Sequence, residues 1–190
     1  MYELRDLVAE LFMEYREGIF EMELGRLAYD LLEMNPDTKI PNQMKKFSGL
    51  QRVEILRCIR EGLDVEPLIR HSFNAKQMSE LRQFQRHGFN VDIICNPSIP
   101  SSKMTLIRRN LIKGVNVSSI DITAYDCEQL AQIFLCIEYD LDYKQLLDPQ
   151  LSAEQMADIR NKLAEERASK GMTTERYRAI HMAIFGDKIR

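Results

Sequence analysis

The sequence has no tryptophan, little glycine and proline, and no long uncharged stretch. Its 190 residues include eight glycines and six prolines, which is few enough for much of the chain to be helical. A membrane-spanning helix needs about 18 consecutive apolar residues, and no stretch of the chain comes near that length. The first residues, MYELRDLVAELF, do not place an apolar run after a basic segment. We therefore expect no secretory signal, no membrane association and a cytoplasmic location.

Reactive side chains are also few, and they lie apart in the sequence. The cysteines form no CxxC pair and no cluster with histidine, so we expect free, mostly buried thiols and no metal site. The histidines lie in no HExxH motif, and the chain has neither a Walker loop nor a GxGxxG motif. Without a convergent set of catalytic groups we predict no enzyme and no cofactor. The residues concerned are Cys58, Cys95, Cys127, Cys136, His71, His87 and His181.

The sequence does have a period of 26 residues. One apolar column contains Phe47, Phe73, Ile99, Tyr125 and Leu151, each 26 residues after the last and without insertion. Further columns recur at the same spacing, among them a polar column, a glutamine column and several apolar columns. Agreement in many columns at one fixed spacing predicts a tandem repeat.

Each predicted unit starts with a helix-capping pattern. Serine, asparagine or aspartate followed three residues later by glutamine is a capping box, in which two open backbone amides of the first turn are satisfied. The third unit has Pro100 instead, so either Ser101 caps that helix or the proline lies in its first turn. The capping boxes are Ser48 with Gln51, Asn74 with Gln77, Asp126 with Gln129, and Ser152 with Gln155.

Each predicted long helix ends at a position suited to a left-handed residue. Gly62, Gly88 and Gly114 occupy this position in the first three units, and Asp140 and Glu166 occupy it in the last two. Glycine adopts the left-handed conformation that closes many helices, which gives helices of about thirteen residues. A short second segment follows, in which aspartate or asparagine precedes an apolar pair. We expect it to form a turn or two of α- or 3₁₀-helix.

One such unit cannot bury its apolar face alone, so its neighbours must stack on it. We predict an all-α fold, an α-solenoid of about five 26-residue helix-turn-short-helix units with helical caps at both ends. The predicted organisation is an N-terminal cap over 1–46, repeats over 47–166 with units starting at 47, 73, 99, 125 and 151, and a C-terminal capping helix over 167–190. Within the caps, we expect helices over 2–18, over about 20–34, and from Thr173 or Thr174 to Phe185.

Charge is segregated along the chain, although the net charge is only −3. Residues 1–38 carry −7, residues 39–115 carry +8, residues 116–166 carry −8, and residues 167–190 carry +4. Such asymmetry either marks an interaction surface or reflects solvated helix faces whose sign varies by chance.

Basic residues recur late in successive predicted helices. Arg82 and Arg86 are four apart and share a face, and stacking would align this face with basic residues of the neighbouring units. The resulting ladder could contact nucleic-acid phosphates or an acidic protein surface. Alternatively, these arginines pair with Glu54, Glu61, Glu80 and neighbouring acidic residues. The candidates are Arg57, Arg60, Arg82, Arg86, Arg108, Arg109 and Lys113.

The acidic stretch offers a second candidate surface. Its carboxylates could mimic phosphates toward a basic partner, or they could meet the basic face of a second copy in a head-to-tail contact. The candidates are Asp121, Asp126, Glu128, Glu138, Asp140 and Asp142.

The patterns LSAEQMADIRNKL and FNAKQMSELRQFQRHGFNV resemble short helical repeats in uncharacterised proteins of phages and other mobile elements of gut Firmicutes. The resemblance covers residues 47–166 and implies a stacked helical fold and a mobile-element origin. It supplies no catalytic residue to transfer. Small proteins from such elements include inhibitors of host defence, anti-CRISPR proteins among them, so inhibition of a host nuclease complex is implied by context alone.

These features predict a non-enzymatic module that binds a protein partner. One alternative is a nucleic-acid-binding repeat protein, whose binding would weaken steeply with salt and be lost on Arg82→Glu with Arg86→Glu. Another is a structural homo-oligomer whose charged parts pair, with a mass above the monomer that falls as salt is added.

Overall fold

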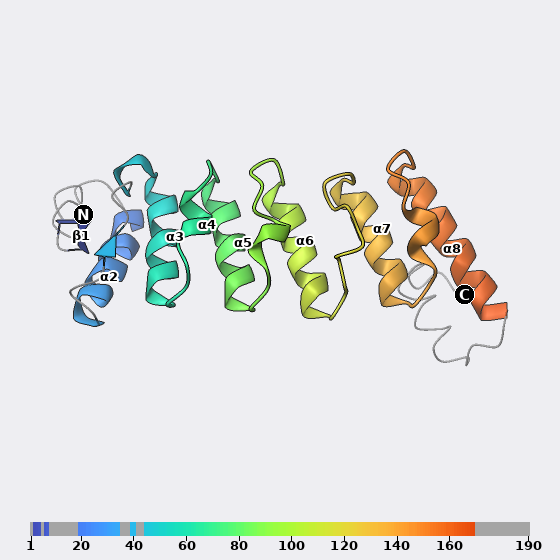
Figure 1. The fold of residues 1–190 in the computed structure, drawn as a ribbon, viewed down its shortest axis with the longest axis horizontal. Helices are drawn as coiled ribbons and strands as arrows, with labels where there is room; N and C mark the ends of the chain where they lie inside the picture. Colours follow the sequence, from blue (N-terminus) through green and yellow to red (C-terminus); the bar gives the residue numbers. More distant parts are fainter. Residues whose placement is uncertain (1, 5, 8–18, 35–38, 41–43, 170–190) are drawn as a thin grey trace. The chain divides into compact units, whose positions relative to one another are not determined.

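The computed structural model describes residues 2–4, 6–7, 19–34, 39–40 and 44–169. Within these ranges the chain is helical apart from turns and one pair of two-residue strands, so the predicted all-α class is confirmed (Figure 1). Internal contacts divide the chain into two compact units, Met1–Met104 and Thr105–Arg190. The division falls within helix α6, which spans Ser101–Ile112.

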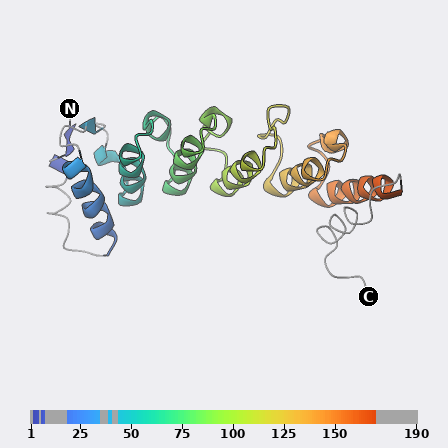
Figure 2. The ribbon, with the colours of Figure 1, turned by 90° about the horizontal axis from the view of Figure 1, so that it is seen from below.

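In the first unit, three long helices lie side by side (Figures 1 and 2). Helix α2 (Ile19–Met34) packs on α3 (Gly49–Arg60), which packs on α5 (Ala75–Arg86). The 3₁₀-helix η1 (Met44–Lys46) precedes α3, and the short α4 (Glu66–Ile69) and η2 (Val91–Ile93) both contact α5. Apolar residues of α2 and α3, together with Met44 of η1 and two leucines near the start of the chain, form a buried core that excludes water. This core contains Leu4, Leu7, Leu27, Ala28, Leu31, Met44, Val53, Ile55 and Leu56.

The beginning of the chain differs from the prediction. Strand β1 (Tyr2–Glu3) pairs antiparallel with β2 (Lys39–Ile40), so the predicted start of a helix at residue 2 is wrong. Strand pairing satisfies backbone groups that the first turn of a helix would leave open. Residues 8–18 of that predicted helix lie outside the described residues, whereas α2 matches the helix expected over about 20–34.

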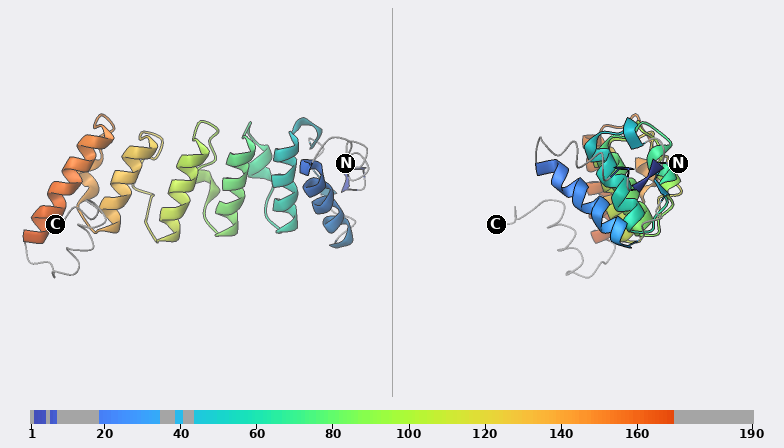
Figure 3. Two further views of the ribbon diagram at one scale, coloured as in Figure 1. Left: turned by 180° about the vertical axis from the view of Figure 1, so that it is seen from behind. Right: turned by 90° about the vertical axis from the view of Figure 1, so that its left-hand side faces the viewer.

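In the second unit, α7 (Cys127–Glu138) packs on α8 (Ala153–Ser169), and η3 (Tyr143–Leu146) contacts both (Figure 3). Glu166 lies inside α8, so the helix end predicted there is wrong. Glutamate favours helix and has no preference for the left-handed conformation that would end it. The helix expected from Thr173 or Thr174 lies outside the described residues. Buried apolar side chains of this unit include Leu130, Ile133, Phe134, Leu146 and Met156.

The predicted capping boxes are present at α3, α5 and α7. At α5, the Asn74 side chain accepts from the Gln77 amide at 3.0 Å, and the Gln77 side chain accepts from the Asn74 amide at 2.9 Å. Ser152 and Gln155 make the same two bonds before α8. At α6, the helix begins at Ser101 and Pro100 directly precedes it. The Pro100 carbonyl accepts from two amides of the first turn, so the proline itself takes the cap position.

Helix closure follows the predicted glycines. Gly62, Gly88 and Gly114 have φ of 67°, 72° and 84°. After each glycine, the next amide donates to a carbonyl five residues back in the helix, which is the Schellman pattern. Asp140 adopts φ 56° and closes α7 in the same way. Helices α3, α5, α6 and α7 have 12 residues each, close to the expected length.

The short segments after these turns begin as predicted. In each, a side-chain oxygen accepts from the amide two residues later, at 2.9 to 3.3 Å. Three of the segments form short helices, α4, η2 and η3, while the segment after Asn116 forms turns. The accepting residues are Asp64, Asn90, Asn116 and Asp142.

Alanine at Gly88 and at Gly25 should change stability in opposite directions. A Cβ at either position meets nothing within 4 Å, so no steric clash contributes. Gly88→Ala should lower the free energy of unfolding by about 1 kcal/mol, because its φ is left-handed. Gly25 lies inside α2, so Gly25→Ala should raise that free energy by up to about 1 kcal/mol. Urea unfolding of both variants measures this, and a Gly88→Ala variant as stable as wild type would contradict it.

Candidate functional site

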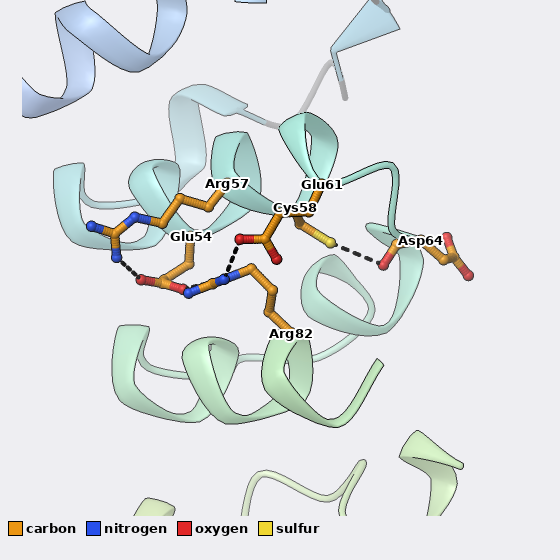
Figure 4. Close-up of polar contacts among 6 residues, drawn as sticks. All are labelled: Glu54, Arg57, Cys58, Glu61, Asp64 and Arg82. Atoms are coloured by element: carbon orange, nitrogen blue, oxygen red, sulfur yellow. Dashed lines mark hydrogen bonds and ion pairs between the residues drawn. The ribbon is translucent and has the colours of Figure 1, made fainter. Parts of the chain in front are cut away.

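Helices α3 and α5 are joined by a buried cluster of ionised side chains (Figure 4). One carboxylate oxygen of Glu54 accepts from Arg57 Nη1 at 2.7 Å, and the other accepts from Arg82 Nε at 2.9 Å. Arg82 Nη1 also donates to Glu61 at 2.7 Å. Glu54 and Arg57 are three apart on α3 and therefore share the face that meets α5. The cluster satisfies charges that would otherwise be costly to bury.

Arg82 is consequently not part of an open basic surface. Its side chain is 7% exposed, whereas Arg86 on the next turn of α5 is exposed. Burial lowers the pKa of Arg82, but the hydrogen bonds and charges of Glu54 and Glu61 outweigh burial and raise it above its usual value. The pairing with Glu54 and Glu61 is the alternative that the sequence left open for this residue.

The second unit contains a related arrangement that lacks the carboxylates. Arg160 donates through Nη1 to Gln132 Oε1 and through Nη2 to Asn161 Oδ1. Arg160 follows Gln132 by 28 residues, the same separation as Arg82 from Glu54. Arg160 is 7% exposed, its Nε has no hydrogen-bond partner among the described residues, and burial lowers its pKa. This guanidinium is therefore buried with less compensation than Arg82.

The capping glutamines have a second role that the sequence analysis missed. The side-chain amide of Gln77 donates to the carbonyls of Pro97 and Ile99, both at 2.8 Å. Gln51 donates to the Phe73 carbonyl at 2.6 Å, and in the second unit Gln129 donates to the Leu151 carbonyl at 2.7 Å. Each glutamine thus caps its own helix and holds the backbone that leads into the next. The available signal was the use of glutamine in every box, since glutamate caps equally well.

A cationic pocket lies between α2 and α3 in the first unit. Arg26, Leu27 and Asp30 of α2 and Arg57 and Arg60 of α3 line a cavity of about 210 Å³. Arg60 Nη1 and Asp30 Oδ2 are 3.9 Å apart, beyond hydrogen-bond distance. The sequence pattern indicated Arg57 and Arg60 but not Arg26, because Arg26 lies in the acidic segment 1–38. Only the packing of α2 on α3 brings these three arginines to one cavity.

The remaining predicted basic residues have separate environments. Arg86 and Arg109 are exposed in the last turns of α5 and α6, where positive charge complements the helix dipole. Arg108 is half-buried. Lys113 Nζ lies 2.8 Å from Glu138 Oε2, so a predicted basic residue and a predicted acidic residue are paired with each other.

Most of the predicted acidic residues make local contacts. Asp126 caps α7, and Asp142 accepts from the amide that begins η3. Asp121 accepts from Thr123, and Asp140 forms an ion pair with Arg167 at 2.5 Å. Glu128 is exposed in the first turn of α7, where a carboxylate stabilises the helix dipole. All six carboxylates named by the sequence analysis belong to exposed residues.

The cysteines are free, as predicted. Cys58 and Cys136 are fully buried, and burial raises the pKa of each thiol to about 12. Cys95 and Cys127 are half-buried. His71 and His87 are exposed and pack against Phe73 and Phe89, while His181 lies outside the described residues.

Within the described ranges, no group of histidine, cysteine and acidic residues is arranged to hold a metal ion, and none of the helices there could cross a membrane. Comparison with known proteins adds no relative from which a role could be transferred. No protein-family model, no curated protein and no solved structure matches this chain.

Proposed function

We propose that this chain is an α-solenoid of 26-residue units that binds a protein partner and catalyses no reaction. The carrying observation is a contrast between two sets of positions that share the 26-residue spacing. Ile55, Leu81, Ile107 and Ile133 are all fully buried. Five residues after each stand Arg60, Arg86, Ile112 and Glu138, which are all exposed and differ in chemistry.

This contrast favours a binding scaffold. The buried positions are all aliphatic and can therefore pack in the same way in each unit. The capping glutamines add hydrogen bonds to the backbone of the next unit. Exposed positions of changing chemistry can form a specific surface along a stack of units. Exposed apolar side chains such as Ile112, at 51% exposure, suit a protein partner better than a phosphate backbone.

The alternatives have weaker support. A nucleic-acid binder would rely on the basic residues, but Arg82 is engaged with Glu54 and Glu61, so its substitution by glutamate would disturb folding as well as binding. A homo-oligomer would pair the basic and acidic surfaces, but Lys113 and Glu138 are already paired within one chain. Inhibition of a host defence complex is the narrowest form of the proposal and rests on the resemblance alone.

The proposal is tested by capture with the purified full chain in a bacterial lysate, with and without nuclease and at low and moderate salt. The test variant is Arg60→Glu with Arg86→Glu. The control is Lys46→Glu with Lys76→Glu, which makes the same charge change at two other exposed residues of the first unit. We expect one protein to be retained by wild type and control and lost from the test variant. Light scattering at low and moderate salt is run in parallel.

Other results would contradict the proposal in recognisable ways. Recovery of nucleic acid alone, lost on nuclease treatment or added salt, would indicate the nucleic-acid binder. A mass above the monomer that falls with salt, without a captured partner, would indicate the homo-oligomer. Equal loss of a captured protein from both variants would mean that capture depends on net charge alone.

A further inference from the structure

The cationic pocket between α2 and α3 has the composition of an oxyanion site. Arg57 and Arg60 are three apart on α3, and Arg26 and Asp30 are four apart on α2, so each pair shares a helix face. Arg26, Arg57 and Arg60 line one small cavity where α2 packs on α3. Planar guanidinium groups bind carboxylates and phosphates through paired N–H donors.

The charges around the pocket are only partly balanced. Among the described residues that line it, Asp30 is the single carboxylate, and it lies 3.9 Å from Arg60. Within the described part of the chain, Arg26 makes no hydrogen bond or ion pair. Glu54, the partner of Arg57, is shared with Arg82. An added anion would therefore find guanidinium donors on Arg26 and Arg60 that the described protein groups do not saturate.

We propose that this pocket binds a carboxylate side chain from an acidic segment of a protein partner. The inference rests on the proposed protein-binding function and specifies the partner's chemistry. A cavity of about 210 Å³ admits one carboxylate with its side-chain stem. Asp30 opposes a phosphate dianion more strongly than a carboxylate monoanion. The neighbouring cluster already holds a carboxylate between two guanidinium groups, as Glu54 lies between Arg57 and Arg82.

The test measures binding of a fluorescent hexaglutamate peptide to the purified full chain at fixed ionic strength. The pocket variant is Arg26→Gln with Arg60→Gln, which leaves Arg57 in place to hold Glu54. The control is Lys46→Gln with Lys76→Gln, which removes the same charge from exposed residues outside the pocket. We expect the pocket variant to weaken binding about tenfold or more, and the control less than about twofold. Amide NMR shifts should change most at α2 and α3, and thermal unfolding checks that both variants fold.

Equal weakening of peptide binding in the pocket variant and the control would overturn the proposed site, because it would indicate attraction to the net charge of the protein. A second contrary result is that an oligonucleotide of matched charge binds more tightly than the peptide and loses its binding in the pocket variant. That result would identify phosphate and not carboxylate as the ligand, and it would overturn the proposal. Absence of peptide binding would also overturn it. If a captured partner were still lost on Arg60→Glu with Arg86→Glu, the binding function would survive that failure. If the pocket bound the peptide but no protein were captured, the site would survive and the proposed function would fail.

Discussion

Replacing Gln77 by glutamate should lower the free energy of unfolding by about 3 kcal/mol, although glutamate is accepted in a capping box. The Gln77 side chain is buried, and its amide donates to the carbonyls of Pro97 and Ile99. A carboxylate can still accept from the Asn74 amide, but it cannot donate. It would place negative charge 2.8 Å from two carbonyl oxygens.

Gln155 provides the matched control. It makes the same capping bonds with Ser152 but is exposed. Gln155→Glu should therefore change stability by no more than about 0.5 kcal/mol. Urea unfolding followed by circular dichroism measures the free energy of unfolding of both variants. Hydrogen exchange at the start of α6 reports the loss of the hydrogen bond from Gln77 to the Ile99 carbonyl. Similar stability of the two variants would show that capping alone explains the choice of glutamine.

Two opposite substitutions, Glu54→Gln in the first unit and Gln132→Glu in the second, should change the stability of their units in opposite directions. Glu54→Gln should destabilise the first unit by about 3 kcal/mol, because it removes a buried carboxylate from between two guanidinium groups. An amide has one acceptor oxygen, whereas Glu54 uses both carboxylate oxygens, one toward Arg57 and the other toward Arg82. Arg82 would keep only Glu61 as an ion-pair partner.

Gln132→Glu should stabilise the second unit by about 1 to 2 kcal/mol. It supplies a carboxylate to Arg160, which is buried and whose Nε has no hydrogen-bond partner in the part of the chain that the structure describes. Hydrogen exchange of α3 and α5 in one variant, and of α7 and α8 in the other, assigns each change to its unit. Destabilisation by Gln132→Glu would mean that the charge of Arg160 is already balanced in the native protein. Unchanged stability of the Glu54→Gln variant would mean that the cluster of Glu54, Arg57 and Arg82 does not stabilise the first unit.

Local structure followed from the sequence because the groups that decide it are close in the chain. Ser48 with Gln51 and Asn74 with Gln77 set helix starts within three residues. Gly62, Gly88 and Gly114 set helix ends because glycine tolerates positive φ. The same reasoning was wrong where a distant strand or a helix-favouring residue decided the outcome, as at Tyr2, which pairs with Ile40, and at Glu166 inside α8.

The sequence by itself determined the all-α class, the capping boxes and the closing turns, because each depends on side chains within one helical turn of the backbone they contact. Tertiary structure alone decided which charges are buried and which are exposed. Arg82 and Arg86 look equivalent on a helical wheel, yet Arg82 meets Glu54 and Glu61 of α3 while Arg86 is exposed. Arg26 joins Arg57 and Arg60 only where α2 packs on α3. The physical reason is that charge pairing depends on distances between helices, and the sequence specifies those distances only through packing.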